Sequence, residues 1–228
     1  MRKLSKERYV VAGFITILLF SLGFLLGSFL NEKKIEDIEK IAKEQESNLN
    51  SLQFQFSYLQ SLPANESCIV LSRILESNLK ILGAAIQRIE AYEQSGDANN
   101  EDYIIVKRKY IVANLRYWLL ADQSKKLCGT DAVNVLYFHS KNCDRCGDEG
   151  YILDQMKKMF GDRLLVFPID VSIAEPMIDV LRAQYRIYSF PNLVIEGKTI
   201  DKFLTMEEMF REICPLYKND YAECEGYR

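Results

Sequence analysis

Histidine and an excess of basic residues are what the sequence most clearly lacks. Among its 228 residues there is a single histidine, His139, and the 29 Lys and Arg are outnumbered by 32 Asp and Glu. A net charge of −3 does not give the basic surface that nucleic-acid binding requires, so we expect no nucleic acid as a partner. Structural zinc sites usually combine about four Cys or His residues at paired short spacings. The six cysteines contain only one such pair, so we predict neither a metal nor a cofactor.

Charged residues are missing from one long stretch near the start of the chain, Tyr9–Leu30. At a rise of about 1.5 Å per residue, a helix of this length spans the roughly 30 Å hydrocarbon core of a bilayer. Basic residues precede the stretch and place the N-terminus in the cytoplasm: Arg2, Lys3, Lys6 and Arg8. We therefore expect residues 1–30 to form a cytoplasmic N-terminus and an uncleaved single-pass anchor. The alternative is a cleaved signal peptide, whose apolar region would be shorter and would end at small residues.

A heptad pattern follows the apolar stretch. From Ile35 to Leu59, apolar residues recur at steps that alternate between three and four, with a polar residue in one slot. The expected helix ends at Leu62-Pro63, because the residue before a proline is pushed out of the helical conformation. The pattern favours either a parallel coiled coil, which would make a homodimer, or one long helix that packs on its own domain.

Two more helices are expected after this one. Helical periodicity runs from about Asn65 to Gln94 and again from Glu101 to about Leu127, and turn-forming residues separate the two stretches. Residues 31–128 are therefore predicted to form a three-helix domain.

The cysteines outside the short pair have predicted partners. Helices joined by a short loop run antiparallel, and Cys68 and Cys128 lie at nearly equal chain distances on either side of the loop near Asp97. We predict a Cys68–Cys128 disulfide at the open end of this hairpin, since the chain beyond the anchor is expected on the extracytoplasmic side, where disulfides persist. The alternative is two buried, inert thiols. In the C-terminal tail, Cys214 and Cys224 are close enough in sequence to form a second bridge.

The short pair, Cys143 and Cys146, lies between an apolar run at residues 133–138 and a helical pattern that follows it. A Cys-x-x-Cys at such a junction is typical of a redox motif. The spacing lets the sulfurs form a bond, and the dipole at a helix N-terminus stabilises a thiolate on Cys143, which is the reactive form.

The elements around this pair predict an α/β domain at residues 129–216, followed by a tail at 217–228. The periodicity indicates the order strand, helix, strand, helix, strand, strand, helix. The predicted ranges are 133–138, 143–160, 164–167, a helix that begins at Pro176, 192–195, 199–203 and 206–213.

This order of elements resembles the thioredoxin fold, a central mixed sheet with flanking helices, over about Asp131–Pro215. Cys143-Asp144-Arg145-Cys146 stands where that family carries its active site, and Ser189-Phe190-Pro191 stands where it carries a cis-proline. The resemblance implies that Pro191 shapes a substrate groove and that Phe190 offers backbone hydrogen bonds to a bound peptide. The alternative for Pro191 is an ordinary trans proline at the start of a strand.

The chain also departs from the thioredoxin pattern. Asn142 replaces the usual tryptophan, Tyr151 replaces a helix-kinking proline, and Tyr137 replaces the buried aspartate that assists proton removal from the second cysteine. These departures favour extracytoplasmic relatives such as the Dsb and disulfide-isomerase groups. The proton of Cys146 would need another acceptor, such as water, His139 or a nearby acid. His139 is otherwise a structural residue at the strand end.

We therefore expect a membrane-anchored thiol–disulfide oxidoreductase that acts on extracytoplasmic protein thiols and disulfides or on a membrane redox partner. Cys143 would form a mixed disulfide that Cys146 resolves. Asp144 and Arg145 shift the thiolate pKa in opposite directions, so the direction of electron flow is open. The alternatives are a non-catalytic adaptor with a static Cys143–Cys146 bridge, and a metal site that lacks two further ligands.

Overall fold

The computed structural model describes residues 14–22, 51, 53–55, 57–95 and 101–227. The chain divides into two compact units, Met1–Ser61 and Leu62–Arg228. Most of the expected anchor and most of the heptad segment lie outside the described residues. Within the expected anchor, residues 14–22 are described and are helical. Among the residues that are described, no helix combines the length and the apolar character needed to cross a bilayer. The helix before Pro63 ends at Ser61, next to the position predicted from the proline.

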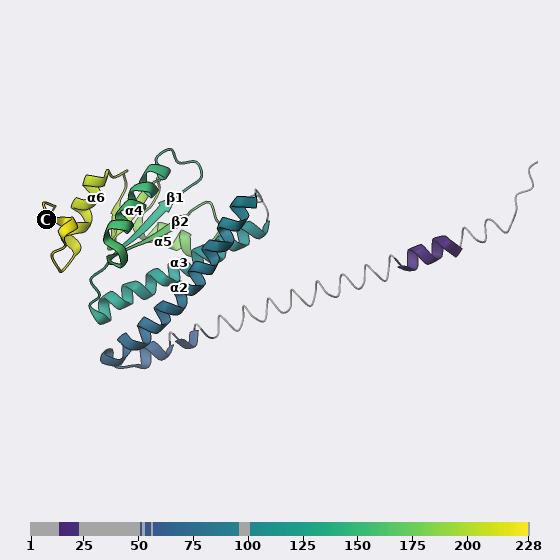
Figure 1. Cartoon of the computed structure of the whole chain (residues 1–228), viewed down its shortest axis with the longest axis horizontal. Coiled ribbons are helices and arrows are strands. Elements are labelled where there is room, and N and C mark those ends of the chain that lie inside the picture. The colour runs from purple at the N-terminus through teal and green to yellow at the C-terminus, as the bar shows by residue number, and fades with distance from the viewer. Residues whose placement is uncertain (1–13, 23–50, 52, 56, 96–100, 228) are drawn as a thin grey trace, which may run out of the picture. The chain divides into compact units, whose positions relative to one another are not determined.

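The second unit contains a helical hairpin and an α/β sheet domain (Figure 1). Its helices and strands are, in chain order, α2 (Ala64–Ser95), α3 (Glu101–Cys128), β1 (Val133–His139), α4 (Cys146–Phe160), β2 (Leu164–Asp170), α5 (Pro176–Tyr185), β3 (Asn192–Ile195), β4 (Lys198–Ile200) and α6 (Met206–Ile213).

The sheet is mixed and has the strand order β2-β1-β3-β4. β1 pairs in parallel with β2 and antiparallel with β3, and β3 pairs antiparallel with β4. The β3–β4 hairpin turns through Glu196 and Gly197, whose φ angles of 48° and 84° are the positive values that a two-residue hairpin turn needs. The mixed α/β architecture agrees with the predicted class.

Two apolar clusters place helices on both faces of the sheet. One cluster joins β1 and β3 to α4, α6 and the C-terminal tail, and the other joins β1 and β2 to α3 and α5. Successive strand residues point to opposite faces, so Val135 and Tyr137 enter the first cluster while Leu136 and Phe138 enter the second. Figure 1 shows α2 lying alongside α3, next to the sheet. The hairpin and the sheet lie within one compact unit, Leu62–Arg228.

Strand β2 forms one edge of the sheet and extends past its predicted end. The apolar run predicts a strand that stops before Pro168, but the strand continues through this proline to Asp170. A proline is tolerated at a sheet edge because no ladder partner needs its N–H. Asn114 of α3 donates a 2.9 Å hydrogen bond to the Pro168 carbonyl, and Lys107 forms a 3.1 Å ion pair with Asp170. Helix α3 therefore covers this edge of the sheet.

The C-terminal tail is part of the sheet domain. Tyr217 and Cys224 are buried in the cluster that contains α4 and α6. The Asp131 carboxylate, at the start of the domain, accepts hydrogen bonds from the Lys218 and Asn219 backbone N–H groups at 2.9 and 3.1 Å. These contacts fasten the tail beside the beginning of β1.

Candidate active site

Cys143 and Cys146 lie at the turn that connects β1 to α4. They form a disulfide with Cα atoms 5.4 Å apart. Cys143 is half-buried, and Cys146 is 7% exposed. Helix α4 begins at Cys146 rather than at Cys143, because the first helical hydrogen bond runs from the Glu149 N–H to the Arg145 carbonyl. Cys143 therefore lies just before the helix, where its sulfur faces the positive end of the dipole.

Arg145 is the one basic residue between the cysteines, and it is held by two contacts. Its Nε donates to Asp148 at 3.0 Å, and its guanidinium lies 3.9 Å from the centre of the Phe203 ring. Asp144 on the other side is exposed. The fixed guanidinium places a positive charge at the helix start, which favours the thiolate form of a nearby cysteine.

The segment before β3 completes the surroundings of the cysteine pair. The Phe190–Pro191 peptide bond is cis. Phe190 and Cys143 both pack, half-buried, against the cluster that contains Cys146. Asp201, just after β4, accepts a hydrogen bond from the Ser189 hydroxyl and another at 3.1 Å from the Asn192 amide. This carboxylate ties both sides of the cis peptide to the end of the β hairpin.

Tyr137 lies beneath the cysteine pair at the position where the thioredoxin pattern has an acid. Its hydroxyl donates a hydrogen bond to the backbone carbonyl of Cys146. Burial, together with the charge of Glu149, holds the pKa of this phenol well above its ordinary value. Tyr137 is therefore protonated at neutral pH and acts as a donor that fastens β1 to the first turn of α4.

Glu149 is the site residue that sequence reasoning missed. It is completely buried, its Oε2 accepts a 3.0 Å hydrogen bond from the Leu204 N–H, and its Oε1 has no hydrogen-bond partner within the described part of the chain. Burial raises the pKa of this carboxyl to about 7. The signal was present in the sequence, because Glu149 occupies a core position in the helical repeat of buried residues that runs along α4: Cys146, Glu149, Leu153, Met156 and Phe160.

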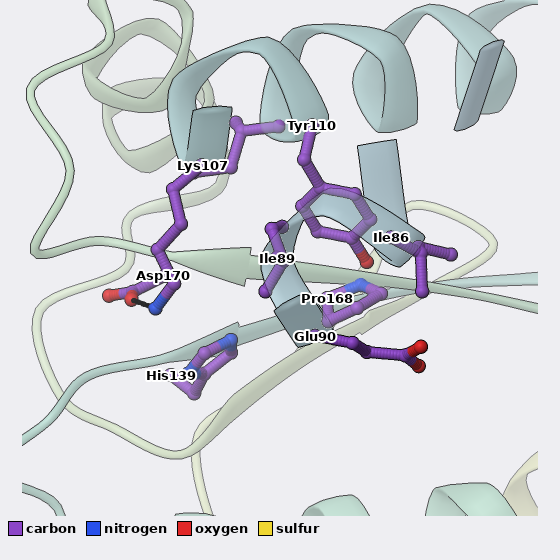
Figure 2. Close-up of a pocket in the computed structure, with 9 residues that line it drawn as sticks. Ile86, Ile89, Glu90, Lys107, Tyr110, His139, Pro168 and Asp170 are labelled. Carbon is purple, nitrogen blue, oxygen red and sulfur yellow. Dashed lines mark hydrogen bonds and ion pairs between the residues drawn. The ribbon is translucent and has the colours of Figure 1, made fainter. Parts of the chain in front are cut away.

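His139 ends β1 and opens onto a pocket of about 300 Å³ between the sheet and the helical hairpin. Figure 2 shows it on the same side of the pocket as the Lys107–Asp170 ion pair. Its ring stacks on Tyr137 with centroids 5.2 Å apart. Burial lowers the pKa of the imidazole, which Asp170 opposes and Lys107 reinforces. His139 is therefore neutral at pH 7, next to this ion pair.

The remaining cysteines are also brought together in pairs. Cys68 near the start of α2 is bonded to Cys128 at the end of α3, with Cα atoms 5.6 Å apart, and Cys214 is bonded to Cys224 at 5.4 Å. No group of acidic, Cys and His side chains that could hold a metal ion occurs among the described residues. The arrangement has one pair at a helix start, in which Cys143 is half-exposed and Cys146 is buried, and two other bridges that join structural elements.

Comparison with known proteins finds structural neighbours of low similarity. No family model matches the chain, and no curated protein matches it. It is similar to the structure of a malarial protein, at 21% identity over 37% of this chain and 96% of that chain, with a TM-score of 0.33. It is also similar to thioredoxin-2, a component of the malaria parasite protein secretion machinery, at 22% identity over 37% of this chain and 82% of that chain, with a TM-score of 0.33. A third neighbour is chloroplastic thioredoxin z, at 19% identity over 42% of this chain and 88% of that chain, with a TM-score of 0.34.

Two of these neighbours are thioredoxins, but identities and TM-scores this low carry no argument about this chain. The chemistry of the site is therefore inferred from its own residues. A half-exposed cysteine at a helix start, bonded to a buried partner, can exchange its disulfide with an external thiol.

Proposed function

We propose that this protein is a thiol–disulfide oxidoreductase whose redox centre is Cys143 and Cys146. The observation that carries the proposal is the asymmetry of the pair. Cys143 is half-exposed before the first turn of α4, whereas Cys146 is 7% exposed. An incoming thiolate can therefore reach one sulfur of the bridge, and the other is shielded as an internal resolving group.

The reaction follows from this asymmetry. In one direction, the Cys143 thiolate attacks a substrate disulfide and forms a mixed disulfide, which Cys146 resolves. In the other direction, a substrate thiolate attacks Cys143 and releases Cys146. Pro191 and Phe190, next to the same core cluster, are proposed to line the groove that receives an extended segment of the substrate.

The proposed setting is the extracytoplasmic face of the cell membrane. The uncharged stretch Tyr9–Leu30 and the basic residues before it support a single-pass anchor with its N-terminus in the cytoplasm. Three paired disulfide bridges in one chain also suit an oxidising compartment. The substrates would then be exported proteins or a membrane redox partner.

The test is disulfide exchange by the full-length chain and its Cys143→Ser variant. We expect the wild type to accelerate reduction or oxidation of a model protein disulfide and the variant to lose this activity. Cys68→Ser with Cys128→Ser is the matched control, since it removes a bridge outside the core cluster that contains Cys146, and it should retain exchange. Full activity in Cys143→Ser would overturn the proposal.

A second candidate function is a non-catalytic adaptor in which the helical hairpin binds a partner. The observation that favours it is a set of exposed apolar side chains on α3, spaced at seven residues: Ile105, Val112 and Leu119. Such a spacing repeats on one face of a helix. The adaptor hypothesis predicts that partner capture survives Cys143→Ser, whereas the oxidoreductase hypothesis predicts that covalent trapping of substrates is lost.

A further inference from the structure

Resolution of a mixed disulfide needs the thiolate of Cys146, and the surroundings of this cysteine oppose its formation. The thiolate, not the thiol, is the attacking species, and an apolar environment raises the pKa of a thiol. Cys146 is 7% exposed and belongs to an apolar core cluster. At neutral pH the reduced protein therefore needs a group that takes the proton of Cys146.

Tyr137 does not meet this need. Its hydroxyl donates a hydrogen bond to the backbone carbonyl of Cys146 and keeps its proton. A phenol whose pKa is raised by burial is not a base at neutral pH. His139 opens onto the pocket beside Lys107 and Asp170, and burial lowers the pKa of its imidazole, which makes it a weaker proton acceptor.

Glu149 lies on the same buried face of α4 as Cys146. It follows Cys146 by three residues in α4, and side chains at this spacing are neighbours on one helix face, with Cβ atoms about 5–6 Å apart. Both side chains are buried on that face. The Leu204 N–H fixes Oε2 at 3.0 Å, which leaves Oε1 without a partner among the described residues. A buried carboxylate oxygen with no donor is available to receive a proton.

We propose that Glu149 is the proton acceptor and donor of Cys146, a role that rests on the oxidoreductase function proposed above. In this chain the carboxyl belongs to the first turn of α4, and the residue on β1 that bonds to Cys146 is Tyr137.

The step balances as follows. In the mixed disulfide, Cys143 Sγ is bonded to a substrate sulfur and Cys146 is a thiol. Glu149 takes the thiol proton, the Cys146 thiolate attacks Cys143 Sγ, and the new bond forms as the bond to the substrate breaks. The substrate leaves as a thiolate and takes a proton from solvent, so the two cysteines lose the two electrons that the substrate disulfide gains. In the reverse direction, Glu149 returns its proton to the leaving Cys146.

The charged and titratable groups around Glu149 set the pH at which it works. Burial is the main influence and raises its pKa to about 7, which Glu208 of α6 reinforces. The Leu204 N–H and Arg145 oppose this shift, and the protonated Tyr137 faces it from β1. A carboxyl that titrates near neutrality can exchange a proton with a thiol in either direction.

The experiment follows one turnover of the reduced full-length protein with Ellman's reagent. Attack by Cys143 releases a first nitrothiobenzoate in a bimolecular phase, and resolution by Cys146 releases a second in a unimolecular phase. In Glu149→Gln, which keeps an oxygen for the Leu204 N–H, we expect an unchanged first phase. The second phase should be slower by roughly 100-fold at pH 7, the low end of general acid–base contributions. Asp154→Asn, an exposed acid on the same helix, is the matched control and should resolve at the wild-type rate.

The pH profile distinguishes proton transfer from a structural role. The wild-type resolution rate should rise with a midpoint near pH 7, and in Glu149→Gln the rise should move to about pH 8.5 or above, where a thiol ionises unaided. Wild-type and variant rates with the same profile would overturn the proposal. A wild-type midpoint at pH 8.5 would also overturn it, and this measurement uses the wild-type protein alone, so it does not depend on the folding of a variant. A missing first phase in the wild type would instead count against the oxidoreductase function itself.

Discussion

Two side chains near the cysteine pair, Tyr137 and Glu149, have separate roles: one is a hydrogen-bond donor and the other is an ionisable acid. Tyr137 supplies volume and a hydrogen bond to the Cys146 carbonyl, and its proton stays in place. Glu149 supplies an ionisable group in the same region, held by one backbone N–H. Separating the two roles lets the strand residue be an aromatic core residue while the helix carries the acid.

The burial of Glu149 predicts a pH-dependent stability. Its pKa is raised to about 7 in the folded protein from an ordinary value of 4.5, so folding favours the protonated acid. The stability that this preference contributes is fully present below about pH 4.5 and is lost as pH rises through about 7. Relative to Glu149→Gln, the wild type should therefore lose about 3 kcal/mol of unfolding free energy between pH 4 and pH 8.5.

Denaturant unfolding at the two pH values, with all disulfides intact, measures this difference. Asp154→Asn serves as the control because the carboxylate it replaces is exposed, and its effect on stability should be the same at both pH values. An equal effect of Glu149→Gln at pH 4 and pH 8.5 would show that the carboxyl titrates normally.

At the scale of elements, helix α3 protects the edge of the sheet. Unpaired edge strands invite pairing with other chains, and natural proteins cover them or place prolines in them. Both features occur in β2. Pro168 lies within the strand, and Asn114 of α3 donates a hydrogen bond to the Pro168 carbonyl. The helical hairpin thus stabilises the domain that carries the cysteine pair.

Asn114→Ala should weaken this contact. The Asn114 side chain is 2% exposed, and its loss leaves the Pro168 carbonyl without its donor, which costs about 1–2 kcal/mol. Thermal or denaturant unfolding of the oxidised protein measures the loss. Gln87→Ala, at an exposed position of α2, should change stability by less than about 0.5 kcal/mol. If the two variants are equally stable, α3 does not hold the edge through this hydrogen bond.

The whole molecule shows which features a sequence pattern can carry. The two hairpin helices, the order of the elements in the sheet domain and its mixed α/β class follow from periodicity, turn residues and the position of the cysteine pair. Such local signals suffice because each element buries one face, and the spacing of apolar residues along the sequence identifies that face.

Other features depend on contacts between distant residues. β2 continues through Pro168 because it is an edge strand, which its own residues do not reveal. The C-terminal tail joins the core through Tyr217 and through contacts with Asp131, far away in sequence. Glu149 stands at a core position of α4, but only the fold shows that the Leu204 N–H meets its carboxylate and that the Tyr137 hydroxyl bonds to the Cys146 carbonyl.

Of the three bridges in the described part of the chain, we expect one to be exchangeable and two to be structural. Cys143 is half-exposed just before a helix, whereas Cys214 and Cys224 are buried. Cys68 and Cys128 are also half-exposed, but their bridge joins the two helices of the hairpin across 60 residues of sequence. A redox-active pair should equilibrate with a thiol buffer, and a structural bridge should resist it.

The most direct test of this claim is a redox titration of the full-length chain. The protein is equilibrated with glutathione buffers of increasing reducing strength, free thiols are alkylated, and each cysteine-containing peptide is quantified by mass spectrometry. We predict that Cys143–Cys146 opens reversibly between about −120 and −270 mV, while Cys68–Cys128 and Cys214–Cys224 stay closed. A Cys143–Cys146 bridge that stays closed below about −300 mV, together with the other two, would contradict the account.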